Sequence, residues 1–133
     1  MKVTGARLML LALSACSAEQ ARPSAIDYGE VEVPLARLSS DDARQRGRLL
    51  FEQKCVLCHG VRADGNGVRN KGLSAKPASF ASPGWRGSAT PLSVYEVLSE
   101  GKRGTSMPAW PTLTDDQKWD VIAYVLSVAE DGP

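Results

Sequence analysis

Histidine and cysteine are scarce in this chain of 133 residues, which contains one histidine, His59, and three cysteines. Structural zinc sites use four cysteine and histidine ligands, usually as two spaced pairs. Only one such pair is present, Cys55 and Cys58. Aromatic residues make up 6% of the chain, so a core built from side chains alone would be thin. A small domain of this kind is commonly held together by a metal, a disulfide or a cofactor.

The chain also has no large excess of charge of either sign. Sixteen basic residues face fifteen acidic ones, for a formal net charge of +1. The sequence has no basic run and no interleaving of basic and aromatic residues, which are the marks of nucleic-acid-binding proteins. We therefore expect no nucleic-acid partner.

No apolar run is long enough to cross a membrane, which takes ~20 residues. The first run, residues 8–13, is short and follows a positively charged start, which is the layout of a secretory signal peptide. It ends in the letters LSAC, so Cys16 falls where the small-residue cleavage site should end. This resembles the lipobox of bacterial lipoproteins, in which the cysteine is lipidated. An ordinary signal peptide that contains a cysteine is the alternative.

The lipoprotein interpretation divides the chain into three parts. Residues 1–15 are expected to form the signal peptide, and residues 16–39 a flexible leash attached to lipid at Cys16. Acyl chains would hold the protein on a membrane surface without spanning it. We expect an exported protein on the periplasmic side of a bacterial membrane, with its folded domain in residues 40–133.

That domain is predicted to be all-α with a loop-rich middle. Most of the 12 glycines and 8 prolines lie between positions 60 and 111, and three other stretches have the spacing of helices. Ser39 is the predicted cap of the first helix, Thr90 of the second, and Thr114 of the third, where a glutamine three residues on completes a capping box. Gly101 and Gly132 are expected to end the second and third helices.

The letters CVLCH at Cys55 to His59 are the main chemical signal in the chain. A redox disulfide of the thioredoxin type sits beside a βαβ unit, which this sequence lacks. A zinc site lacks its second pair of ligands. C-x-x-C-H is the attachment signature of c-type haem: the two thiols form thioether bonds to the vinyl groups, and the histidine reaches the iron. This interpretation uses every residue of the motif and agrees with export.

Met107 is the candidate for the second axial ligand. It is the one methionine after His59 and lies in the loop sequence GTSMPAWP, between the second and third predicted helices. A methionine that only packs in a core or loop is the alternative. Met/His ligation is the usual pairing in cytochromes c and raises the potential of the iron.

These motifs together resemble a class I c-type cytochrome, the small monohaem type, over residues 41–128. The resemblance rests on Gly47 and Phe51 before the haem motif, on the motif itself, on the Met107 loop, and on Ile122-Ala123-Tyr124 in the last helix. It implies three to five helices wrapped around one covalent haem, with the first and last helices crossing where Gly47 and Phe51 meet Val121 and Tyr124.

The resemblance also implies supporting contacts around the haem. A backbone carbonyl accepts the free N–H of the ligating histidine, and Pro77 is the expected supplier. Trp85, Arg86 and Trp110 are expected by analogy near the propionates or the loop of Met107, whereas packing and solvent are the alternatives.

The function implied is single-electron transfer between membrane-associated redox partners, not enzymatic catalysis. A haem sensor or a peroxidase-like enzyme would require Met107 to leave the iron, and the chain has no second histidine for acid–base work on peroxide. A fixed relay subunit of a larger oxidoreductase complex is a further alternative, which would expose an apolar face of ~1,000 Å².

Overall fold

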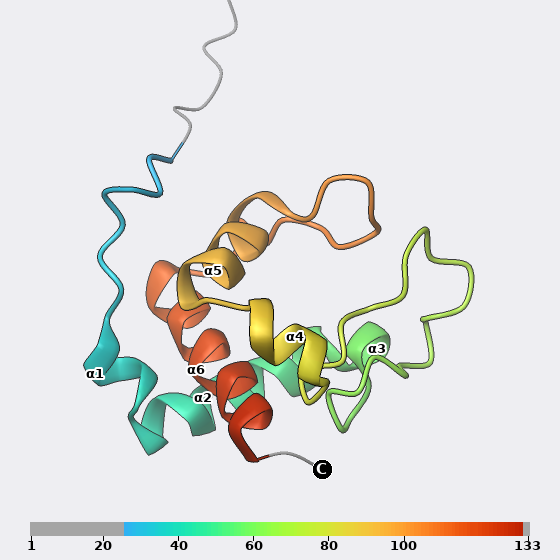
Figure 1. Ribbon diagram of the computed structural model, residues 1–133, viewed down its shortest axis with the longest axis horizontal. Coiled ribbons are helices and arrows are strands. Elements are labelled where there is room, and N and C mark those ends of the chain that lie inside the picture. The colour runs from blue at the N-terminus through green and yellow to red at the C-terminus, as the bar shows by residue number, and fades with distance from the viewer. Residues whose placement is uncertain (1–25, 132–133) are drawn as a thin grey trace, which may run out of the picture.

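The computed structural model describes residues 26–131, which form a helical domain without β-strands (Figure 1). The predicted signal peptide, Cys16 and Gly132 lie outside these residues. None of the described helices is long and apolar enough to cross a membrane. The prediction of an all-α fold is confirmed. The helices are α1 (Leu35–Leu38), α2 (Asp41–Lys54), α3 (Val56–His59), α4 (Pro83–Ser88), α5 (Pro91–Glu100) and α6 (Asp115–Asp131).

The crossing of α2 and α6 forms the centre of the fold, and this is the most extensive contact between any two helices (Figure 1). The backbones approach so closely that a side chain at Gly47 would overlap the carbonyl group of Asp120. The rings of Phe51 and Tyr124 lie beside this contact, with centroids 5.2 Å apart. Phe51 is almost completely buried, and Val121 belongs to the same hydrophobic cluster. The crossing implied by the family resemblance is therefore confirmed.

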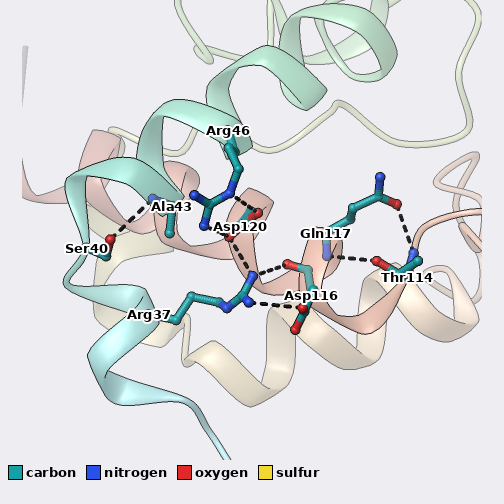
Figure 2. A network of polar contacts seen from close by, with 8 residues as sticks. All are labelled: Arg37, Ser40, Ala43, Arg46, Thr114, Asp116, Gln117 and Asp120. Atoms are coloured by element: carbon teal, nitrogen blue, oxygen red, sulfur yellow. Dashed lines mark hydrogen bonds and ion pairs between the residues drawn. The ribbon is translucent and has the colours of Figure 1, made fainter.

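The helix caps agree with the predictions at α5 and α6 but not at α2. Thr90 forms a capping box at the start of α5, and Thr114 exchanges hydrogen bonds with Gln117 at the start of α6 (Figure 2). Ser40, not Ser39, caps α2 by accepting a hydrogen bond from the backbone of Ala43. The prediction of Ser39 was wrong because that residue ends the short α1, which the sequence pattern did not reveal.

Residues 26–39 contact the helical domain. Tyr28 donates a hydrogen bond to Glu100 at 2.8 Å, and its ring meets that of Tyr95 edge to face. Val31, Val33 and Leu38 pack against the hydrophobic cluster. The leash predicted for residues 16–39 is therefore wrong for residues 26–39, because their apolar side chains pack against the hydrophobic cluster of the domain.

A buried carboxylate ties three helices together (Figure 2). Asp120 in α6 is only 4% exposed and accepts hydrogen bonds from Arg37 of α1 at 2.9 Å and from Arg46 of α2 at 2.8 Å. Arg37 also pairs with the exposed Asp116. A buried charge is tolerated only when it is paired in this way. The network therefore holds α1 and α2 in place on α6.

Candidate functional site

A single helical turn carries the C-x-x-C-H motif. Cys55 ends α2, and its carbonyl accepts hydrogen bonds from the backbones of Cys58 and His59 at 3.1 and 2.9 Å. Both cysteines are free, half-buried thiols. Burial raises the pKa of Cys55 to about 11, so this sulfur is a neutral thiol at pH 7. The two sulfurs and the imidazole thus lie within one turn, as the haem interpretation requires.

His59 is buried and has one well-defined polar partner. Its Nδ1 lies 3.1 Å from the carbonyl oxygen of Ala78. Because a carbonyl can only accept, Nδ1 carries the proton in this bond, and Nε2 keeps its lone pair. Burial lowers the pKa of His59, which favours the neutral ring. A neutral imidazole with a free Nε2 is the form that binds a metal.

The carbonyl partner differs from the expected one by one residue. The resemblance implies Pro77 as the acceptor, but the carbonyl oxygen of Pro77 faces Gly65, where a Cβ would lie 2.5 Å from it. Successive carbonyls of an extended chain point in different directions, so the next one, of Ala78, reaches His59. Pro77 is therefore corrected to Ala78 as the residue that orients the imidazole.

Two phenylalanine rings surround the imidazole. Phe80 stacks on His59 with centroids 4.9 Å apart and 22° between the planes, and Phe51 lies 6.2 Å away. Sequence reasoning missed the role of Phe80. The one available signal was its position two residues after Ala78, on the same loop that supplies the carbonyl.

A glycine-rich loop follows α3 and packs against it. The Asp64 side chain accepts a hydrogen bond from the backbone of Asn66, which makes a tight turn there. Gly67 lies directly against the carbonyl groups of Leu57 and Cys58, where a side chain would overlap them. Glycine at this position therefore allows the loop to close under the motif.

Met107 lies in the loop between α5 and α6, and its backbone is held at both ends. Its carbonyl accepts from the backbone of Lys102 at 3.1 Å, and its N–H donates to the Thr105 hydroxyl at 3.2 Å. Gly101, at φ +77°, approaches the Met107 carbonyl more closely than other residues could. The half-buried side chain packs against the hydrophobic cluster that includes Phe51 and Phe80. His59 and Met107 thus both contact members of this one hydrophobic cluster.

Of the three residues expected near the propionates or the Met107 loop, two have partners in the structure and one has a donor that is unpaired among residues 26–131. Trp85 packs its half-buried ring against Phe80, and Arg86 donates to the carbonyl of Ala129 near the end of α6, so both have structural contacts. The indole N–H of Trp110, in contrast, is buried and has no partner in the described part of the chain. An unpaired buried donor calls for an additional acceptor.

These observations fit the group that the motif implies. The structure offers two thiols on one turn, a neutral imidazole with its Nε2 available, a thioether from a firmly held loop, and an unpaired indole donor. Thioether attachment and axial ligation of a haem need those donors. Within residues 26–131, no three His, Cys, Asp or Glu side chains gather where they could hold a metal ion.

Comparison with known proteins gives a family. Residues 42–125 match the family model described as cytochrome c oxidase, cbb3-type, subunit III. The chain is 30% identical over 98 residues to cytochrome c55X of Stutzerimonas stutzeri, which covers 70% of this chain and 73% of that protein. It is 26% identical over 88 residues to the cbb3-type cytochrome c oxidase subunit CcoP of Azospirillum brasilense, which covers 65% of this chain and 29% of CcoP.

A solved structure has a similar fold. One chain of the reducing HAO-like protein complex of Kuenenia stuttgartiensis superposes with a TM-score of 0.64 and 30% sequence identity. The match covers 74% of this chain but 49% of that one. The present chain therefore corresponds to part of CcoP and of this neighbour, and to most of cytochrome c55X.

Proposed function

The chain belongs to the family of the cbb3-type cytochrome c oxidase subunit III, and from this premise we propose how its residues carry out electron transfer. It is a c-type cytochrome with covalently bound haem c, and its function is electron transfer with redox protein partners. We propose which residues bind the haem, which kind of protein exchanges electrons with it, and where the chain is lipidated.

Cys55 and Cys58 would hold the haem through thioether bonds, and His59 and Met107 would be the ligands of its iron. The hydrogen bond between His59 Nδ1 and the Ala78 carbonyl is the observation that carries this assignment. It orients the ring, selects the tautomer and raises the basicity of Nε2. Phe80 stacks on one face of the ring and Phe51 packs beside it at a tilt, so both restrict its movement and help to exclude water.

With both His59 and Met107 bound, the iron would have no open position for substrate, which favours an electron carrier over an enzyme. Haem iron supplies a one-electron couple, and Met/His ligation favours the reduced state. The residues of this chain contribute rigidity: the Met107 loop is held by Lys102 and Thr105, and His59 by Ala78. These ligands would then need to move little when the iron changes between its ferric and ferrous states.

The attachment residues can be tested directly by replacing both cysteines with serine. The wild-type protein, produced with haem-attachment machinery, should keep its haem on a denaturing gel and after extraction with acidified acetone. The Cys55→Ser/Cys58→Ser variant should release it under the same conditions. Haem that stayed attached to the double variant would exclude these cysteines as the attachment sites.

A relay subunit of a larger complex is a second candidate for the cellular role. CcoP is named as an oxidase subunit, and the structural neighbour belongs to an HAO-like complex. In either role, we propose a periplasmic location with Cys16 lipidated, because Cys16 follows the short apolar run after two small residues, Ser14 and Ala15. The lipid would keep the domain near membrane-bound redox partners and raise its local concentration there.

A further inference from the structure

The charges of the domain are divided unevenly between two of its loops and the rest of the described chain. The loops at 60–82 and 101–114 contain six basic residues and one acidic residue, for a net charge of +5. The rest of the described chain contains seven basic and thirteen acidic residues, for a net charge of −6. The near-neutral total therefore hides a local excess of positive charge on these two loops. The six basic residues of the loops are Arg62, Arg69, Lys71, Lys76, Lys102 and Arg103, all of them exposed.

The two basic loops form one surface. Ser74 in the first loop donates its backbone N–H to the Ser106 hydroxyl at 3.3 Å, and the two hydroxyls are 3.2 Å apart. Both loops project from the same side of the domain, away from α1 (Figure 1). We call the six basic residues of these loops the basic surface.

The loops that carry this surface lie beside the residues assigned to the haem. The first loop is bonded to the motif itself: the backbone of Arg69 donates to the Leu57 carbonyl at 2.7 Å, and that of Gly67 to the Cys58 carbonyl at 3.1 Å. The second loop carries Met107. Electrons that enter or leave beside the motif therefore pass next to concentrated positive charge.

The charges of the basic surface are available to a partner. Arg62 pairs with Asp64, yet its side chain is 83% exposed. Within residues 26–131, the structure shows no ion pair for the other five basic residues. Three apolar side chains are exposed on the same stretch of chain: Leu57, Val61 and Val68, the last two more than 80% exposed. This combination suits a protein–protein interface. The charges would guide the partner to the surface, and burial of the apolar side chains would stabilise the complex.

We propose that the basic surface is the docking site for an acidic redox protein. The screening length at physiological salt is about 8 Å, so an approaching molecule senses the nearest charges and not the small net charge of the whole chain. Such a partner would be drawn to the two basic loops and repelled by the acidic segments, which are residues 26–34 (net −3), α5 (net −2) and α6 (net −4), and it would thereby be oriented toward the motif. This inference rests on the proposed haem site.

Two small redox reagents of opposite charge can measure the sign of the electrostatic potential beside the motif. One electron passes from the reduced protein to hexacyanoferrate(III), giving hexacyanoferrate(II), or to hexaammineruthenium(III), giving the ruthenium(II) ion, with no bond formed or broken. The rate with the anion should fall roughly threefold or more as salt rises from about 10 to 500 mM, and the rate with the cation should rise. Rates that did not change with salt, or changed in the opposite sense, would overturn the proposal.

Variants then locate the charge. The Arg69→Gln/Lys71→Gln/Lys76→Gln variant should lose most of the salt dependence with the anion. Each of the three single variants is compared with Arg48→Gln, which removes the same charge, because Arg48 lies on α2, pairs with Glu52 and is outside the basic surface. An equal effect of the control would show that the rate reports total charge and would contradict the docking site.

Binding provides a measurement independent of electron transfer. Poly-L-glutamate, a soluble mimic of an acidic protein, should bind the Cys16→Ser protein in isothermal titration, and the triple variant should bind roughly tenfold more weakly. Failure to bind poly-L-glutamate, together with salt-sensitive binding to phosphatidylglycerol vesicles, would assign the surface to the membrane and refute a protein partner. An absorption spectrum taken first separates failure of the haem assignment from failure of this inference.

Discussion

The carbonyl oxygen of Ala78 lies 3.1 Å from Nδ1 of His59, and Gly65 determines where that carbonyl is. Gly65 has φ +76° and packs against the carbonyl of Pro77, the residue before Ala78. The orientation of the proposed iron ligand thus depends on a glycine six residues away in sequence.

Gly65→Ala should therefore displace the segment of Ala78 and weaken the hydrogen bond to His59. We expect a loss of about 1–3 kcal/mol in the free energy of unfolding, from overlap and backbone strain. A less basic ligand should also raise the reduction potential. Gly72→Ala is the control, since Gly72 has the same positive φ but nothing within 4 Å of an added Cβ. Equal stability and potential in both variants would contradict the role of Gly65.

Gly47→Ala should separate α2 from α6. The added methyl group would overlap the backbone of Asp120, which cannot move aside, so the expected loss is about 3 kcal/mol in denaturant unfolding. Gly84→Ala introduces the same group on a helix with open space around it and should change stability by less than about 1 kcal/mol. If Gly47→Ala proved as stable as the Gly84 variant, the close crossing would be wrong.

Asp120→Ala should destabilise the domain because it leaves Arg37 and Arg46 without their shared buried partner. We expect a loss of about 2–3 kcal/mol in the free energy of unfolding. This is at the low end of the range for removing one partner of a buried ion pair, because both guanidinium groups are still partly exposed to water. Asp116→Ala removes the other partner of Arg37, a carboxylate that is 76% exposed, and should have little effect. Thermal unfolding of the two variants side by side provides the comparison.

Met107→Ala should keep the covalent haem but open the iron to added ligands. Loss of the thioether should lower the reduction potential by on the order of 0.1 V, within the roughly 0.8 V that axial ligands can span. Carbon monoxide should then bind the reduced variant readily, as seen by absorption spectroscopy. Val68→Ala, at a side chain that is 83% exposed, is the control and should bind none. A Met107 variant that refused carbon monoxide would exclude Met107 as a ligand.

Cys16→Ser should release the protein from membranes, because it removes the proposed lipidation site. Fractionation of cells that express each form should move the variant to the soluble fraction, and mass spectrometry of the wild type should detect the acyl chains. Washing the membranes with high salt controls for attachment through a partner protein. A variant that stayed with the washed membranes would indicate another anchor.

The sequence predicted those features of the fold that depend on residues close together in the chain, such as helix caps, or on a single small residue. The capping residues of α5 and α6 and the small Gly47 were correct because each acts through neighbours in sequence or through one close contact. The short α1 was missed, since four residues provide no helical period. Its attachment to the domain depends on Arg37 meeting Asp120, 83 positions later.

The site was predictable to the level of its motif but not of its surroundings. The C-x-x-C-H spacing indicates haem because attachment needs two thiols for the vinyl groups and a histidine next to them for the iron. The choice between the Pro77 and Ala78 carbonyls, in contrast, depends on the path of a loop. The stacking of Phe80 on His59 and the unpaired N–H of Trp110 arise from packing between distant segments. The charge division became visible only when the two loops were found side by side.

The absorption spectrum of the purified protein, oxidised and reduced, tests the central claim most directly. The account predicts a low-spin, six-coordinate haem in both states, which stays attached after denaturation and acid extraction because Cys55 and Cys58 bind it covalently. A high-spin, five-coordinate spectrum, or haem that can be extracted, would contradict the assignment of Cys55, Cys58, His59 and Met107.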